Sequence, residues 1–150
     1  MVKVYTSSVI DAPAAEIWDR IRDFNGLPNW HPAIADSRIE LQQPADKVGC
    51  IRNFTLKDGG RIREQLLALS DYDFSVTYSI LESPMGVSNY IATLKLTPVT
   101  DGNRCFAEWT AEFDCAPGRE TELARNIGQG VFQGGFDALK SSMTRQRRIV

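Results

Sequence analysis

The stretch between residues 34 and 115 constrains the fold most, because apolar and polar residues alternate along it with a period of two. Turn signals interrupt the alternation at residues 44–47, 57–60, 70–73, 83–86 and 98–103. Two of these breaks contain Asp58-Gly59-Gly60 and Asp101-Gly102, which are typical of tight hairpins. The stretch therefore predicts about six consecutive antiparallel strands.

The segment before this stretch predicts one more strand and two short helical elements. Residues 3–10 predict the first strand, and Pro13 is suited to the first position of the helix that follows. This helix should bury one face, made of Ile17, Trp18, Ile21 and Phe24. Two prolines limit the next segment, residues 27–32, to a short helical turn.

Residues 117–145 predict one long closing helix. Its expected buried stripe consists of Ala124, Ile127, Gly128, Val131, Gly135, Ala138, Leu139 and Ser142. Because Gly128 and Gly135 fall on this stripe, we expect the helix either to approach the sheet closely or to leave space there. A basic cluster at its end is interpreted as a solvated helix terminus: Arg145, Arg147 and Arg148.

Length and composition indicate an ordinary globular protein. A chain of 150 residues predicts a single domain over residues 1–150, and a net charge of −2 gives no reason to expect nucleic-acid binding. No segment resembles a signal peptide or a membrane span, so we expect a cytoplasmic protein without membrane insertion. The cysteines are odd in number and lack C-x-x-C spacing, which predicts reduced thiols at Cys50, Cys105 and Cys115.

Two charged residues fall on strand faces that are otherwise apolar. Glu64 shares its face with Ile62, Leu66 and Ala68, and Arg52 shares its face with Cys50, Phe54 and Leu56. An unpaired buried charge is costly, so each must meet a partner. One interpretation is an ion pair between Arg52 and Glu64 that only closes the core. The other is a ligand pocket in which they are polar anchors.

Three aromatic residues with polar atoms also lie on apolar strand faces, namely Tyr78, Tyr90 and Trp109. A buried phenol needs a hydrogen-bond partner, so core packing and contact with a ligand are both consistent with these positions. Glu108 neighbours Trp109 on the opposite face, where we expect it to be solvated.

Trp30 and His31 lie on a stiff segment between two prolines. They are interpreted either as a core plug beside a surface histidine or as the mouth of a pocket. Because His31 titrates near neutrality, it is a candidate general acid or base, together with Glu64.

Other kinds of site find no support in the residues. The glycine-rich run at residues 128–135 lies inside a helix, so its amides do not form a nucleotide-binding loop. There is one histidine and no metal-ligand spacing, and the sequence lacks a G-x-S-x-G elbow. We therefore expect no metal and no cofactor.

Four segments carry a family resemblance: residues 10–18, Trp30-His31-Pro32, residues 48–52 and residues 108–113. They resemble the START-like (SRPBCC) superfamily of polyketide cyclase/dehydrase and lipid-transport proteins, which also includes the birch-pollen allergens and the abscisic-acid receptors. The resemblance implies an α+β helix-grip fold: a seven-stranded curved antiparallel sheet wraps the C-terminal helix, with two short helices after strand 1 and a cavity between sheet and helix.

The same resemblance suggests where a ligand would lie. Glu64 and Tyr90 would line the cavity, and residues 57–60 and 82–86 would flank its entrance. The abscisic-acid receptors anchor their ligand on a lysine near the position of Pro32, whereas residues 27–34 here contain no lysine or arginine. Their gate-loop motif is also missing, so hormone sensing by that mechanism is not expected.

Three functions are consistent with this reading. The first is binding or carriage of a small apolar molecule such as a lipid, polyketide, sterol or terpenoid, with Trp30, His31, Arg52, Glu64, Tyr78, Tyr90 and Trp109 as candidate ligand-binding residues. The second is a polyketide cyclase or dehydratase that uses Glu64 as general acid or base. The third is a co-chaperone-like interaction module. The sequence leaves open whether the protein forms a homodimer.

Overall fold

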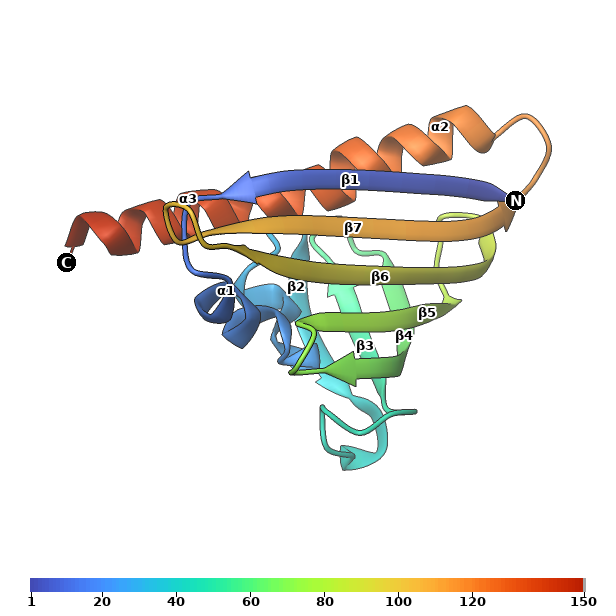
Figure 1. Cartoon of the computed structure of the whole chain (residues 1–150). Coiled ribbons are helices and arrows are strands. Elements are labelled where there is room, and N and C mark those ends of the chain that lie inside the picture. The colour runs from blue at the N-terminus through green and yellow to red at the C-terminus, as the bar shows by residue number, and fades with distance from the viewer. Residues whose placement is uncertain (150) are drawn as a thin grey trace.

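The computed structural model describes residues 1–149 and the side chains of residues 1–143. The elements follow in the order β1 (Val2–Ile10), α1 (Ala14–Ile21), η1 (Phe24–Asn29), β2 (Ile34–Ile39), η2 (Glu40–Gln42), β3 (Ile51–Leu56), β4 (Arg61–Ser70), β5 (Ser75–Glu82), β6 (Val87–Val99), β7 (Arg104–Cys115), α2 (Glu120–Arg125), η3 (Asn126–Phe132) and α3 (Gln133–Ile149) (Figure 1). The basic side chains interpreted as a solvated helix end, Arg145, Arg147 and Arg148, lie outside the described side chains.

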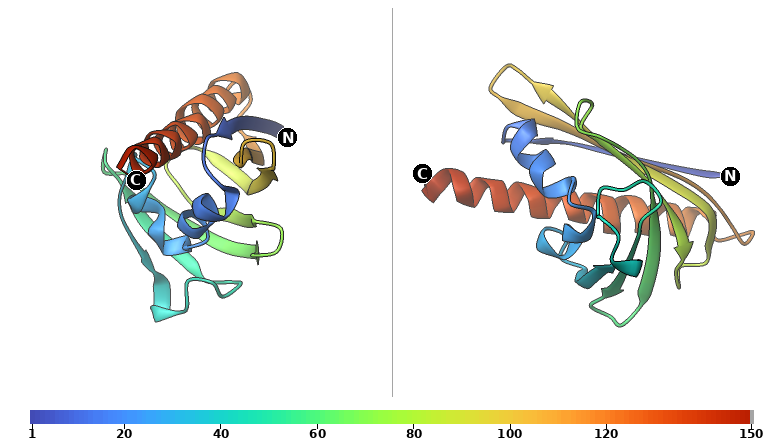
Figure 2. Two further views of the ribbon diagram at one scale, coloured as in Figure 1. Left: turned by 60° about the vertical axis from the view of Figure 1, so that its left-hand side comes forward. Right: turned by 90° about the horizontal axis from the view of Figure 1, so that it is seen from below.

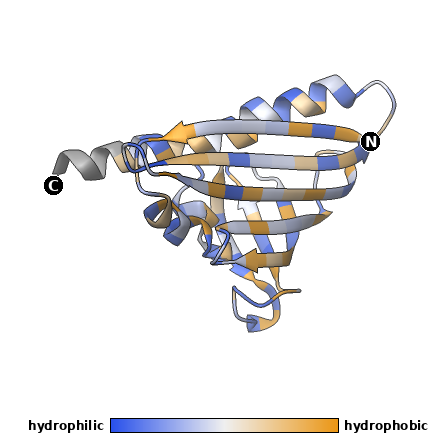
Figure 3. Cartoon of the chain, viewed as in Figure 1, coloured by the Kyte–Doolittle hydropathy of each residue, from blue (hydrophilic) through white to orange (hydrophobic). Residues whose placement is uncertain are grey.

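All seven strands form one antiparallel sheet with the order β1-β7-β6-β5-β4-β3-β2. Figure 2 shows the sheet curving around the C-terminal helix, with α1 and η1 near one end. The expected alternation of hydropathy is visible along the long strands in Figure 3. The predicted α+β helix-grip architecture is therefore confirmed.

The first helix forms where its sequence predicts, but Pro13 is its N-cap and not its first residue, and Phe24 belongs to η1. Pro13 is the residue that precedes its first turn, and Glu16 in that turn suits the positive end of the helix dipole. The expected face, including Ile17, Trp18 and Ile21, is buried. The next turn, η1, is a 3-10 helix that contains Pro28, as the two prolines predict.

The closing helix differs from its prediction in start and register. It begins at Glu120 and contains a π-helical segment, η3, in which the backbone N–H of Gln133 donates to the oxygen of Gly128, five residues back. The wider turn rotates the later residues, so Phe132 is buried and Val131 is 36% exposed. The buried face consists of Leu123, Ile127, Gly128, Phe132, Gly135, Phe136, Leu139 and Met143. The strictly α-helical stripe was thus wrong at Val131 and omitted Phe132 and Phe136.

Two glycines on this face allow close contact between helix and sheet. A Cβ atom on Gly128 would lie 3.1 Å from Cγ1 of Val4 on β1, and a Cβ atom on Gly135 would lie 3.0 Å from Cζ3 of Trp109 on β7. The Thr6 hydroxyl also donates to the oxygen of Gly128 at 3.2 Å. Of the two alternatives that the sequence left open, close approach or unfilled space, the structure shows close approach at both glycines.

Two β-bulges set which side chains face inward. On β4, Leu66 pairs with Tyr78 and Ala68 pairs with Thr77, so Leu67 is an extra residue. The bulge turns Ala68 outward, where it is exposed, and the prediction that it shares the buried face of Glu64 is wrong. On β6 a second bulge lies between Ser88 and Ile91.

The β6 bulge places Tyr90 in the interior. Asn89 adopts a φ of 52°, in the left-handed region that asparagine tolerates better than most residues. Its side-chain amide donates to Oδ2 of Asp114 on β7 at 3.0 Å, which holds the bulge. The next residue, Tyr90, then points to the buried side of the sheet and stacks on Phe113.

Candidate functional site

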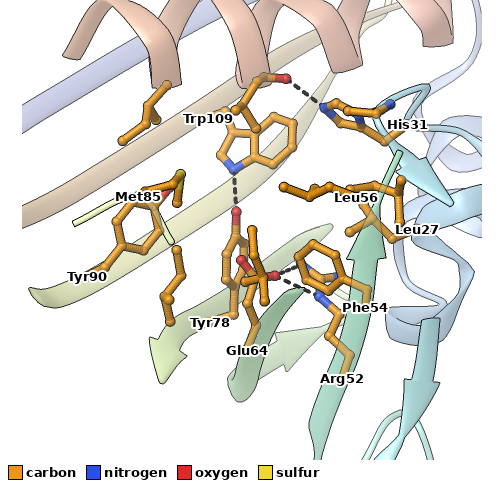
Figure 4. A pocket seen from close by; sticks show the side chains of 16 residues that line it. Leu27, His31, Arg52, Phe54, Leu56, Glu64, Tyr78, Met85, Tyr90 and Trp109 are labelled. Carbon is orange, nitrogen blue, oxygen red and sulfur yellow. Dashed lines mark hydrogen bonds and ion pairs between the residues drawn. The ribbon is translucent and has the colours of Figure 1, made fainter. Parts of the chain in front are cut away.

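A pocket of about 160 Å³ lies between the inner face of the sheet, the segment around η1, and the π-helical segment η3 (Figure 4). Its polar or partly polar lining residues are His31, Arg52, Glu64, Tyr78, Tyr90 and Trp109. The rest of the wall is apolar and includes Leu27, Phe54, Ile62, Ile80, Met85, Ile127 and Val131. An apolar wall with a few convergent polar groups is typical of a small-molecule site.

The centre of the polar wall is an ion pair between adjacent strands. Arg52 on β3 pairs with Glu64 on β4 in the sheet register, so both side chains project into the same space. Nε and Nη2 of Arg52 lie 2.8 and 2.7 Å from Oε1 of Glu64. The other oxygen, Oε2, accepts no hydrogen bond within the described part of the chain. The carboxylate is therefore only half satisfied by the protein.

Burial dominates the electrostatics of Glu64. Its side chain is almost entirely removed from solvent, and this loss of hydration raises its pKa, while the charge of Arg52 and the hydrogen bond from it oppose the shift. Arg52 itself is held on several sides. Its Nη1 donates to the backbone oxygen of Phe24 at 3.1 Å, and its guanidinium lies over the rings of Phe24 and Tyr78 at 4.0 and 4.9 Å.

The two tyrosines and Trp109 form the wall beside this pair. Nε1 of Trp109 donates to the Tyr78 hydroxyl oxygen at 3.1 Å. The Tyr90 hydroxyl lies on the same pocket wall and is close enough to influence the pKa of Tyr78. Burial and the nearby negative charge of Glu64 raise the pKa of both phenols, so both are protonated at neutral pH.

His31 lines the pocket with both ring nitrogens already bonded. The backbone N–H of Ala33 donates to Nδ1 at 3.2 Å, which leaves the hydrogen on Nε2. Nε2 lies 2.9 Å from the oxygen of Val131 in η3 and donates to it. Burial lowers the pKa of His31, and the charge of Arg52 adds to this effect. His31 thus ties the η1 segment to the helix as a neutral imidazole.

Trp30 does not line the pocket. Its ring packs 6.0 Å from that of Trp109, on the side of the helix glycine Gly135. Its Nε1 is buried and makes no hydrogen bond within the described residues. The structure therefore brings six of the seven predicted residues to one pocket, whereas Trp30 is buried in the core outside it.

Similarity to known proteins identifies the family of this chain. The model of the family described as polyketide cyclase / dehydrase and lipid transport matches residues 1–144. The chain belongs to this family. No curated protein matches it.

Solved structures of other proteins of similar length have the same fold. XoxI from Bacillus cereus is 27% identical, with a TM-score of 0.88 over 98% of this chain and 99% of its own. A protein from Thermobifida fusca is 30% identical, with a TM-score of 0.87 over 97% of this chain and 95% of its own. Norcoclaurine synthase from Thalictrum flavum, solved with dopamine and hydroxybenzaldehyde, is 18% identical with a TM-score of 0.74 over 95% of this chain and 86% of its own. This last likeness extends to the fold alone.

The candidate ligand-binding residues named from the sequence omit several side chains that line the pocket. Met85 lies in the turn between β5 and β6, where its carbonyl oxygen accepts a hydrogen bond from Arg119 at 3.3 Å. Val131 and Ile127 reach the pocket from the π-helical segment, and both lie on the stripe that helical periodicity indicated. Turn geometry decides the position of Met85, and periodicity does not signal it. Leu56 and Ile80 were also detectable, because each shares a predicted strand face with Arg52 or Tyr78.

The described residues contain no group of three or more histidine, cysteine, aspartate or glutamate side chains arranged to hold a metal ion. Among the same residues, no helix is long and apolar enough to cross a membrane. Glu108 lies on the outer face of β7, where it accepts a hydrogen bond from the Tyr5 hydroxyl at 2.7 Å.

Proposed function

We propose that this protein binds and carries a small, largely apolar organic molecule in the pocket between the sheet and the C-terminal helix. The observation that supports this most is a charged pair at the edge of an apolar pocket, with one carboxylate oxygen left unpaired. Folding alone favours neither feature, since unfilled space loses dispersion contacts and buried charge is costly to desolvate. A ligand that fills the space and meets the oxygen accounts for both.

The size of the pocket bears on the class of ligand. Its volume of about 160 Å³ is close to that of engineered apolar cavities, of roughly 150 Å³, that take up benzene. Of the ligands expected from the sequence, sterols and long-chain lipids would require the pocket to widen. A molecule built on a single ring fits as the pocket stands. Norcoclaurine synthase, which shares the fold, was solved with two single-ring compounds, dopamine and hydroxybenzaldehyde.

Native mass spectrometry of the purified protein, before and after extraction with organic solvent, tests this proposal. We expect a bound compound that is lost on extraction. Ala33 is exposed yet lines the pocket, so Ala33→Phe should block the mouth and abolish retention. Ala35 is exposed two residues later, on β2, and does not line the pocket, so Ala35→Phe is the matched control. Equal retention by both variants would contradict the proposal.

A second candidate function is general acid–base catalysis by Glu64, as in a cyclase or dehydratase. It is favoured by one observation: a carboxyl group whose pKa is raised by burial faces a pocket that also holds two phenols. His31 is less suited to that role, because both of its nitrogens are bonded within the protein. Glu64→Gln separates the two functions. A carrier should keep binding with altered preference, whereas an enzyme should lose its turnover by orders of magnitude.

The third expectation, a co-chaperone-like module, would use the surface instead. Such a module should keep its protein partner when Ala33→Phe blocks the pocket, whereas a carrier should lose its ligand.

A further inference from the structure

The polar atoms of the pocket discriminate between chemical classes of ligand, and the argument rests on the proposed function. The cation in the pocket wall is Arg52. All three guanidinium nitrogens of Arg52 already contact protein oxygens, two of them on Glu64 and one on the backbone of Phe24. Three aromatic rings, those of Phe24, Tyr78 and Phe54, also lie against the guanidinium, at 4.0, 4.9 and 5.7 Å. Arg52 is therefore poorly placed to receive a carboxylate from a ligand.

The Glu64 carboxylate, by contrast, is well placed to receive a group from a ligand. The hydrogen bond and the 2.7 Å ion-pair contact from Arg52 both end on Oε1 of Glu64, and Oε2 accepts no hydrogen bond within the described residues. An ionised carboxylate only accepts hydrogen bonds, so a group that meets Oε2 has to donate one. A hydrogen bond to a charged group is among the stronger ones in a dry site.

A donor lies beside this acceptor. The Tyr78 oxygen accepts a hydrogen bond from Nε1 of Trp109, and the Tyr78 hydroxyl donates none within the described residues. A phenol carries one hydrogen of its own, and Tyr78 makes no hydrogen bond to Glu64. The pocket thus offers an acceptor, Oε2 of Glu64, and a phenolic donor on neighbouring strands. A ligand hydroxyl can donate to the first and accept from the second.

We infer that the pocket selects a neutral single-ring molecule bearing a hydroxyl group, such as a phenol, and excludes carboxylates. The Arg52–Glu64 pair is neutral as a whole. A bound anion would place a second negative charge beside Glu64 in a site shielded from water. A phenol stays neutral at pH 7 and supplies both hydrogen-bonding functions in one group.

Three probes of matched shape test this inference: 4-ethylphenol, ethylbenzene and 4-ethylbenzoate, titrated into the protein at pH 7 by calorimetry. We expect 4-ethylphenol to bind at least about tenfold more tightly than ethylbenzene, since one hydrogen bond to a charged group corresponds to a factor of that size. We expect 4-ethylbenzoate to bind more weakly than ethylbenzene.

Glu64→Gln provides the sharper test, because it leaves Arg52 without a counter-charge. The preference for the phenol over ethylbenzene should shrink, and 4-ethylbenzoate should gain affinity relative to the wild type. Glu112 is exposed on the outer face of β7, so Glu112→Gln is the control and should preserve the wild-type order.

The outcomes separate this inference from the proposed function. If ethylbenzene binds as tightly as 4-ethylphenol, or if the carboxylate binds best, the pocket holds ligands but the selectivity inferred here is wrong. If none of the probes binds, and Ala33→Phe changes nothing in native mass spectrometry, the proposed function fails and this inference fails with it.

Discussion

Two arginine–glutamate ion pairs lie on opposite faces of β4, and they differ in burial and in how many carboxylate oxygens the arginine binds. Glu64 points inward, and Arg52 reaches only one of its oxygens. Its neighbour Arg63 points outward, where Nε and Nη2 bind both oxygens of Glu40 at 2.7 and 2.8 Å. Arg63 also contacts Glu82 at 2.8 Å. The outer carboxylate is fully satisfied by the protein, and the inner one is not.

The pKa values of the two carboxyl groups move in opposite directions. The hydrogen bonds from Arg63 lower the pKa of Glu40 to about 2. For Glu64, loss of hydration outweighs the attraction of Arg52 and raises the pKa. Proximity to an arginine therefore does not fix the state of a carboxyl group. The extent of burial decides whether the pKa of a carboxyl group beside an arginine falls or rises.

The closing helix also has an inward-facing and an outward-facing position side by side, at two adjacent glycines. Gly135 faces inward, and a Cβ atom there would lie 3.0 to 3.2 Å from Trp109, His31 and Trp30. Gly134 has nothing within 4 Å of the same atom. One glycine allows the helix to pack against the pocket wall, whereas the other has no packing role.

The largest expected effect comes from removing one arginine on each face. Arg52→Met leaves Glu64 buried without a counter-charge and should lower the free energy of unfolding by about 3–5 kcal/mol in chemical denaturation. Arg63→Met removes a partly exposed contact and should cost less. The double change of Arg52 and Glu64 to leucine should recover most of the stability lost in Arg52→Met. Equal losses for the two single variants would contradict the comparison.

The adjacent glycines should give changes of opposite sign. Gly134→Ala should raise stability by about 1 kcal/mol, because alanine favours the helix and the site is open. Gly135→Ala should lower it by about 1–3 kcal/mol, because the new methyl group would force two indole rings and an imidazole apart. Thermal denaturation of both variants measures the difference. A stabilised Gly135→Ala protein would show that the inner wall is loosely packed.

A smaller effect is the dependence of stability on pH, which should differ in sign between the two carboxyl groups. Glu40 has a lowered pKa, so its contribution is present above the ordinary pKa of 4.5 and is lost as the pH falls toward about 2. Glu64 has a raised pKa, so its contribution is present below 4.5 and is lost as the pH rises through its folded value.

The matched variants are Glu40→Gln and Glu64→Gln, each compared with the wild type by denaturation across pH 3 to 8. The deficit of Glu40→Gln should grow as the pH rises from the acid end. The deficit of Glu64→Gln should shrink over the same range. Parallel curves would mean that burial does not distinguish the two sites.

Much of this site could be predicted from alternation alone. A period of two places Arg52 and Glu64 on the inner faces of their strands, and the structure has both the ion pair and the pocket that the sequence left as alternatives. The same reasoning fails where the backbone departs from regular geometry. The bulge at Leu67 turns Ala68 outward, and the π-helical turn exchanges Val131 for Phe132. Position relative to a pocket wall, as for Trp30, depends on packing between distant segments, which no local pattern specifies.

The methionine methyl groups allow the central claim to be measured directly. Met85 lines the pocket, Met143 is buried away from it, and Met1 is 83% exposed. In a protein labelled with ¹³C at these methyl groups, titration with 4-ethylphenol should shift the Met85 resonance and leave those of Met143 and Met1 in place. An unmoved Met85 resonance, or equal shifts at all three, would show that the molecule does not enter the pocket beside Arg52 and Glu64.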